Sequence, residues 1–130
     1  MVHNDMAPTP EALRIQEENR VLRTAVSFLQ TFQAEVQESL PIQMATTFMI
    51  VATHENRSLK EYTDLAGVAQ STMSRHLSDL GDKRRTGELG HQLIERLQDP
   101  AELRRNMYRL TPKGRRLKEK LVSVLKKTID

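Results

Sequence analysis

Residues 65–81, LAGVAQSTMSRHLSDLG, decide the fold. They predict a short helix that ends at Gly67, a tight turn, and a second helix. Glycine adopts a positive φ without steric cost, which closes two helices at a steep angle. In the second helix Met73, Leu77 and Leu80 fall at i, i+4 and i+7, so they form one apolar face.

The opposite face of this second helix, expected over 70–81, is small and polar and carries one long cation. Its outward side chains are Ser71, Arg75 and Ser78, and those on its flanks are Thr72, Ser74 and Asp79. Small hydroxylated side chains let a helix enter the major groove of DNA, and an arginine there reaches a guanine or a phosphate. The pattern also fits an amphipathic hairpin with a solvated polar face, so this stretch alone leaves both interpretations open.

The composition bounds the class of protein. At 130 residues the chain is expected to fold as one domain, and its core is mainly aliphatic because it has five aromatic residues and no Trp. The lack of Cys excludes disulfides, thiolate metal sites and thiol redox switches. No apolar run is long enough to span a bilayer, and the first residues lack the basic and apolar regions of a secretion signal. We therefore expect a cytoplasmic, soluble protein with no membrane partner.

Charge is unevenly divided along the chain. Residues 1–65 hold 5 Lys and Arg against 9 Asp and Glu, a net charge of −4, whereas residues 66–130 hold 15 against 8, a net charge of +7. A basic half is typical of a surface that meets a polyanion, and an acidic half is typical of protein contacts. A solvated charged face has the same composition, so the division supports the helix-turn-helix without proving it.

A long helix is expected near the N-terminus, after a flexible tail over 1–8. Thr9 fits the N-cap, and no helix breaker follows until Pro41, so the helix is expected to extend over about 30 residues within 9–40. Its apolar side chains recur at spacings of three and four, which favours pairing with a second copy of the chain. The residues assigned to dimerisation in this helix are Leu22, Ala25, Leu29, Phe32 and Val36. Packing of the helix onto the protein's own core is the alternative.

Two shorter helices are expected before the turn at Gly67. The first runs from Ile42 to about His54 and is apolar enough to be buried. The second begins with a capping box, with Ser58 at the N-cap and Glu61 as the third helical residue. The core face expected for this second helix consists of Leu59, Tyr62, Leu65 and Ala66.

A basic loop and a hairpin follow Gly81. The loop 82–90 is punctuated by glycine and contains Lys83, Arg84 and Arg85. Strands are expected over 92–97 and 106–110, and the polar turn 98–105 between them contains Arg104 and Arg105.

The second strand and the last helix complete the chain. Tyr108 and Leu110 alternate with Met107 and Arg109, as expected for a half-buried strand. Thr111 and Pro112 are then expected to begin a helix over 111–130. Its apolar face includes Leu117, Leu121, Val124 and Leu125.

The order of these elements is that of a winged helix-turn-helix, and the sequence resembles the multiple-antibiotic-resistance regulator (MarR) family over roughly 10–127. The similarity lies in four blocks. They are Gln70-Ser71-Thr72-Met73-Ser74-Arg75-His76-Leu77, Gly90-His91-Gln92-Leu93-Ile94-Glu95-Arg96, Asp99-Pro100 with Arg104-Arg105, and Tyr108-Arg109-Leu110-Thr111-Pro112-Lys113-Gly114. The resemblance implies a mainly α fold with a small β-hairpin, formed by one domain over 9–130. In that domain 9–40 and 111–130 are dimerisation helices, and 41–110 binds DNA.

The resemblance also implies a homodimer with its recognition helices in successive major grooves and its wings in the flanking minor grooves. In the last helix, Leu121 and Leu125 are assigned to dimerisation. The residues expected to contact double-stranded DNA are Gln70, Ser71, Thr72, Ser74, Arg75, Ser78, Lys83, Arg84, Arg85, Arg104 and Arg105. Two features depart from the family pattern. Ala69 replaces the usual Ser or Asp cap, and the loop 82–90 is longer and more basic, so it either contacts phosphates or is a solvated insert.

Patterns typical of catalytic and metal sites are missing from the sequence. It contains neither a GxxxxGKS/T phosphate loop nor a GxGxxG fingerprint, and its four His show no metal-ligand spacing. We therefore expect no enzyme activity, no metal and no cofactor. The expected function is that of a homodimeric, sequence-specific transcription regulator, a repressor that binds a near-palindromic operator. The alternatives are a winged-helix protein-interaction module and a replication or plasmid-maintenance factor.

Many members of that family respond to small aromatic or anionic ligands, which bind between the dimerisation and DNA-binding parts. In this sequence Phe28, Phe32 and Phe48 either line such a pocket or form plain core. The sequence leaves open whether a small-molecule effector exists.

Overall fold

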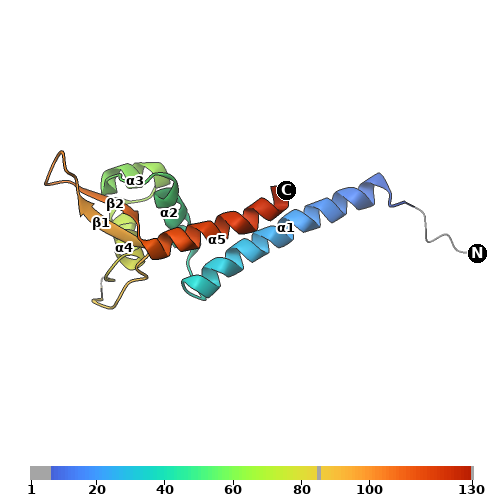
Figure 1. Cartoon of the computed structure of the whole chain (residues 1–130), viewed down its shortest axis with the longest axis horizontal. Coiled ribbons are helices and arrows are strands. Elements are labelled where there is room, and N and C mark those ends of the chain that lie inside the picture. Colours follow the sequence, from blue (N-terminus) through green and yellow to red (C-terminus); the bar gives the residue numbers. More distant parts are fainter. Residues whose placement is uncertain (1–6, 85, 130) are drawn as a thin grey trace, which may run out of the picture.

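Five helices and a two-stranded β-hairpin make up the part of the chain that the computed structural model describes, residues 7–84 and 86–129 (Figure 1). They are α1 (Pro10–Glu35), α2 (Ile42–Thr53), α3 (Leu59–Ala66), α4 (Gln70–Leu80), β1 (Ile94–Gln98), β2 (Asn106–Leu110) and α5 (Pro112–Ile129). This order confirms the expected fold class, a mainly α winged helix-turn-helix with a small β-hairpin. Most of the tail predicted over 1–8 lies outside the described residues. Within them, no helix is both long and apolar enough to cross a membrane.

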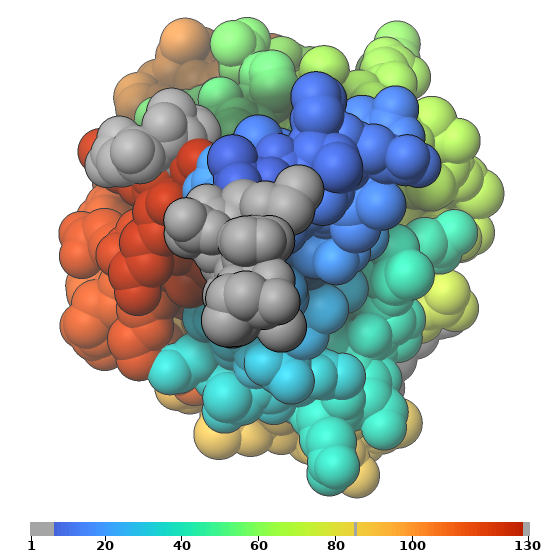
Figure 2. All heavy atoms as spheres, turned by 90° about the vertical axis from the view of Figure 1, so that its right-hand side faces the viewer, coloured from blue at the N-terminus to red at the C-terminus, as the bar shows by residue number. Residues whose placement is uncertain are grey.

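α1 and α5 lie side by side, and the smaller elements gather at one end of this pair (Figure 1). The Arg20 guanidinium of α1 donates to the Thr128 carbonyl oxygen near the end of α5 (3.0 Å), and Lys120 Nζ lies 2.6 Å from the Glu35 carboxylate. The two helices are therefore antiparallel, and the turns of α1 before Arg20 extend beyond the end of α5. Figure 2 looks onto this end and shows the start of α1 in front of the rest of the molecule.

α1 ends at Glu35, so the prediction that it continues to about residue 40 is wrong. The helix stops at Val36 without a glycine or a proline, and Val36 and Leu40 then pack against the hydrophobic core. Partly burying these two apolar side chains favours the turn over further helical residues in solvent.

The helix starts follow the predicted capping chemistry. The Thr9 hydroxyl accepts a hydrogen bond from the Ala12 N–H (3.0 Å) at the start of α1. Ser58 and Glu61 form both halves of the capping box at the start of α3. Gly67 ends α3 with φ +67°, a left-handed conformation that favours glycine, and this turn leads directly into α4. Ala69, at the N-cap of α4, makes no side-chain capping hydrogen bond.

The core lies where α2, α3, α4 and the hairpin meet. Tyr62 is fully buried, its ring packs edge-on against Tyr108 (centroids 6.2 Å apart), and its hydroxyl donates to the His54 carbonyl oxygen (2.6 Å). Burial raises the pKa of Tyr62 to about 12. The prediction that Leu65 belongs to this core is wrong, since it is 49% exposed. Leu65 thus lies largely in solvent although α2, α4 and β2 all pack against α3.

The hairpin pairs β1 with β2 in antiparallel register from Ile94 opposite Leu110 to Gln98 opposite Asn106. β2 has its predicted bounds, but β1 starts two residues later than expected. Gln92 has φ +57°, and the Leu93 N–H donates to the Leu80 carbonyl oxygen (2.8 Å), so this segment joins the end of α4 instead of the sheet.

The predicted alternation along β2 is weak. Leu110 is fully buried and Tyr108 is half-buried, but Met107 and Arg109 on the other face are half-buried too. Their cross-strand partners cover them, and the Arg109 Nε lies 2.5 Å from the Glu95 carboxylate.

Candidate nucleic-acid interface

α4 buries one face and exposes the other, as the sequence predicts. Met73, Leu77 and Leu80 are at most 3% exposed and anchor the helix in the core. The outer face contains exposed Gln70, Ser71, Ser74 and Arg75, together with half-buried Thr72 and Ser78. The outer face of α4 therefore combines small polar side chains with one exposed arginine, and that combination can enter a DNA groove.

His76 holds α4 against α2, a role that its sequence context did not indicate. It is only 5% exposed, and its Nδ1 lies within hydrogen-bond distance of the Thr47 hydroxyl (3.1 Å). Burial lowers the pKa of His76, and the charge of Arg75 lowers it further. The spacing in the sequence could have predicted that His76 is buried, because it follows Met73 by three residues and so lies beside the apolar face of the helix.

The basic loop 82–90 folds back on the end of α4. The Gly90 N–H donates to the Asp82 carbonyl oxygen (2.8 Å), and the His91 N–H donates to that of Asp79 (3.0 Å). The Arg84 guanidinium lies 3.7 Å from the Asp79 carboxylate and 3.6 Å from that of Glu88. Arg84 is thus engaged within the protein, whereas Lys83 is exposed. Arg85 lies outside the described residues.

The two adjacent arginines of the wing, the turn 98–105 of the hairpin, have different surroundings. Arg104 is exposed, and no carboxylate of the described residues lies within ion-pair distance of it. Arg105 forms an ion pair with Glu61 at the start of α3, and its Nε lies 3.7 Å from the Asp99 carboxylate. The Ser58 N–H and the charge of Arg105 both lower the pKa of Glu61. Arg105 therefore links the wing to α3, the helix that precedes α4.

Comparison with known proteins gives similarity in structure alone. A scan against protein-family models finds no match, and a search of curated proteins finds none. Among solved structures, the S. aureus MepR–DNA complex has a TM-score of 0.66 and 18% identity, with 91% of this chain and 86% of that chain covered. MarR has a TM-score of 0.56 and 20% identity, with 86% and 74% covered. PcaV from Streptomyces coelicolor, in complex with its natural ligand, has a TM-score of 0.53 and 23% identity, with 98% and 80% covered.

The chain has the MarR-type winged-helix fold. In this fold the winged-helix part and the helix pair α1–α5 are distinct regions, and the predicted dimerisation residues all belong to the pair. Exposure divides these residues into two groups.

The first group of predicted dimerisation residues is open to solvent. Leu22 is 63%, Leu29 52% and Leu125 43% exposed, and Ala25 is also exposed. Val26, which the sequence analysis did not assign to dimerisation, is 51% exposed on the same helix. These side chains are available to a second copy of the chain.

The second group is turned inward, and the assignment of Phe32 and Leu121 to a dimer interface is wrong. They are only 2% and 4% exposed because they pack in the core of their own protomer. Phe32 makes edge-on contacts with Phe28 (5.4 Å between centroids) and Phe48 (5.9 Å). Val36 is half-buried against the same core.

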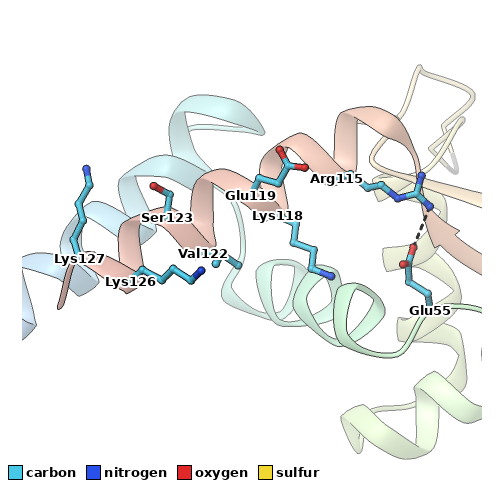
Figure 3. Close-up of a pocket in the computed structure, with 8 residues that line it drawn as sticks. All are labelled: Glu55, Arg115, Lys118, Glu119, Val122, Ser123, Lys126 and Lys127. Carbon is cyan, nitrogen blue, oxygen red and sulfur yellow. Dashed lines mark ion pairs between the residues drawn. The ribbon is translucent and has the colours of Figure 1, made fainter. Parts of the chain in front are cut away.

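This protein has an apolar cavity and a larger open cleft along α5. An apolar cavity of about 200 Å³ is lined by Phe28 and Phe48 together with residues of α2 and α5, while Phe32 does not line it. A larger open cleft of about 710 Å³ is lined mainly by charged residues of α5, and Glu55 lies 3.7 Å from Arg115 at one end of it (Figure 3). Lys118 borders both hollows.

Proposed function

We propose that this protein is a homodimeric, sequence-specific double-stranded DNA-binding regulator that represses transcription, and that it is not an enzyme. The observation that carries the proposal is the outer face of α4. Ser71, Ser74 and Arg75 are exposed there, on a helix that its opposite face fixes in the core. A rigid helix that presents small polar side chains and an arginine is suited to direct contact with base edges.

Within this proposal, the side chains of α4, the wing and the loop 82–90 have different tasks. Arg75 contacts base edges, and Gln70, Ser71, Thr72, Ser74 and Ser78 fit the walls of the major groove. Arg104 enters the minor groove, whose negative potential attracts arginine. Arg105 positions the wing through Glu61, and Lys83 contacts the phosphate backbone. The MepR–DNA complex, which shares this fold, supports DNA as the partner.

The exposed apolar residues of α1 support the homodimer. Leu13, Ile15, Val21, Leu22, Val26 and Leu29 are each at least 44% exposed. The turns before Arg20 extend past α5, so no other element of the described chain covers them. A two-fold dimer requires a near-palindromic operator with half-sites about 34 Å apart, one turn of DNA.

A small aromatic anion is the proposed effector class. The apolar cavity beside Phe28 and Phe48 accommodates a ring. Lys118 lines its edge and donates from Nζ to the Ala52 carbonyl oxygen (3.2 Å), and its remaining N–H groups can meet a carboxylate. The ligand complex of PcaV supports an effector in this fold. Benzoate is a suitable probe, and it should raise the melting temperature of the wild type but not of Lys118→Met.

Selection of bound sequences from a random duplex pool tests the proposed function. The expected result is one enriched motif with two-fold symmetry and half-sites about one helical turn apart. If no motif is enriched and binding does not depend on salt, the winged helix contacts a protein partner instead. The cytoplasmic location expected from the sequence stays a prediction.

A further inference from the structure

A groove separates α4 from the hairpin formed by β1 and β2. It has a volume of about 320 Å³, and its walls come from α4, the loop 82–90 and both strands. Ser74 and Ser78 line it from α4, Lys83 from the loop, Arg96 from β1 and Tyr108 from β2. The two serine hydroxyls and the Lys83 ammonium thus share one depression with Arg96, which comes from a different segment of the chain.

The register of the hairpin explains how Arg96 reaches this groove. Arg96 is opposite Tyr108, and Ile94, two residues earlier on the same face, is opposite Leu110. Ile94 and Leu110 are at most 1% exposed, whereas Arg96 is exposed. Arg96 therefore lies on the same face of the sheet as buried Ile94 and Leu110, but beyond the core, where this face borders α4.

The ion pairs of this region distinguish Arg96 from the arginines around it. Arg84 is within 4 Å of Asp79 and Glu88, Arg105 is paired with Glu61, and Arg109 is paired with Glu95. Within the described residues, neither Arg96 nor Lys83 has a carboxylate at ion-pair distance. Asp82 also lines the groove, so two cations face one carboxylate and a net positive charge remains.

We propose that this groove binds a phosphate of the DNA backbone, held by Arg96 and Lys83 and by the hydroxyls of Ser74 and Ser78. The inference rests on the proposed function. Suppose that α4 occupies a major groove of the DNA and the wing occupies the adjacent minor groove. The sugar–phosphate backbone that separates these two DNA grooves must then cross the protein surface between α4 and the hairpin. Guanidinium, ammonium and hydroxyl groups are all phosphate donors, and such contacts fix the position of a protein on the duplex without selecting its sequence. Arg96 was not among the DNA contacts expected from the sequence.

The test compares Arg96→Gln with Arg109→Gln, a matched control. Both variants remove one positive charge from neighbouring positions of the same hairpin, but Arg109 is paired with Glu95 and does not line the groove. Affinity is measured for a selected operator and for its scrambled duplex, from about 50 to about 200 mM salt. Lys83→Gln is the second test variant, and thermal melting verifies that all variants are folded.

The expected result is that Arg96→Gln weakens binding to both duplexes by the same factor. Its plot of log affinity against log salt concentration becomes shallower by about 1 per protomer, because one phosphate contact is lost. Lys83→Gln behaves in the same way, and Arg109→Gln keeps the wild-type slope.

Two results would overturn the inference while leaving the proposed function intact. In the first, the wild type binds DNA but neither Arg96→Gln nor Lys83→Gln changes the salt slope. In the second, Arg96→Gln and Arg109→Gln change it equally, so that only net charge matters. A wild-type protein that shows no salt-dependent binding to any duplex would overturn both proposals.

Discussion

The ion pair between Arg105 and Glu61 allows a direct test of how the wing is positioned. In our account Arg105 links the wing to α3, and Arg104 contacts DNA. Arg105→Gln and Glu61→Gln should then weaken operator binding to a similar extent, and the double variant should be little weaker than either one. Both changes remove the ion pair that joins the wing to α3, whereas the other pairs of these residues, Arg105 with Asp99 and Glu61 with Arg57, do not join the two elements. Glutamine at position 61 retains the capping box, so α3 still has its N-terminal hydrogen bonds.

The size of the effect follows from exposure. The Arg105 and Glu61 side chains are 38% and 35% exposed, so water screens the pair, and its loss should cost at most about fivefold in affinity per protomer. Removing a side chain that contacts the groove directly should cost about tenfold or more, which is the expectation for Arg104→Gln.

Fluorescence anisotropy with a labelled operator measures all four variants of the cycle and the Arg104 control. A loss for Arg105→Gln that greatly exceeds the loss for Glu61→Gln, and that adds to it in the double variant, would refute this reasoning. Arg105 would then contact DNA directly, as the sequence alone had indicated.

Three further predictions concern packing, pH and assembly. Gly90→Ala should lower the free energy of unfolding, measured by urea titration, by about 2 kcal/mol. The Cβ of the new alanine would lie 2.1 Å from the Gly81 carbonyl oxygen, a backbone atom that cannot move freely. A variant with the urea midpoint of the wild type would contradict this close approach. Folding lowers the pKa of His76 below its ordinary value of 6.5. As the pH falls, the unfolded chain therefore binds a proton at His76 before the folded chain does. The free energy of unfolding should decrease as the pH drops from about 7.5 to about 5.5. His76→Gln should flatten part of that pH dependence, and an unchanged profile would exclude His76 as its source. Leu22→Glu should convert the dimer to a monomer in analytical ultracentrifugation, whereas the exposed polar control Gln33→Glu should remain dimeric; a Leu22→Glu dimer would exclude this face of α1 as the interface.

Local chemistry explains the parts of the fold that the sequence predicted well. Thr9, the pair Ser58 and Glu61, and Gly67 each specify a helix end through their own hydrogen bonds or backbone conformation, so neighbouring residues suffice to identify them. The inward face of α4 was equally predictable, because the spacing of Met73, Leu77 and Leu80 determines which side of the helix is apolar.

The errors concern contacts between segments that are distant in the sequence. The end of α1 depends on Val36 packing against a core built by later helices, and no residue near it marks the stop. Phe32 has the same spacing as Leu22 and Leu29, yet it lies where α1 meets Phe48 and is therefore buried within the protomer.

The candidate interface was predictable in outline but not in its charge pairing. The sequence indicated a basic loop and a basic wing, but it gave no means to decide which arginines have internal carboxylate partners. Arg84 and Arg105 have them, whereas Arg96 and Arg104 have none among the residues that the structure describes. That distinction depends on Asp79 and Glu61, whose positions next to the loop and the wing follow only from the tertiary structure.

The most direct test of the central claim, that the outer face of α4 recognises base sequence, is the affinity of Arg75→Ala for a selected operator and for its scrambled duplex. Arg75 is exposed, so its removal should leave the fold intact. We predict a loss of about 1–3 kcal/mol per protomer on the operator, a much smaller loss on the scrambled duplex, and relaxed preference at one position of each half-site. Equal losses on both duplexes would contradict the claim.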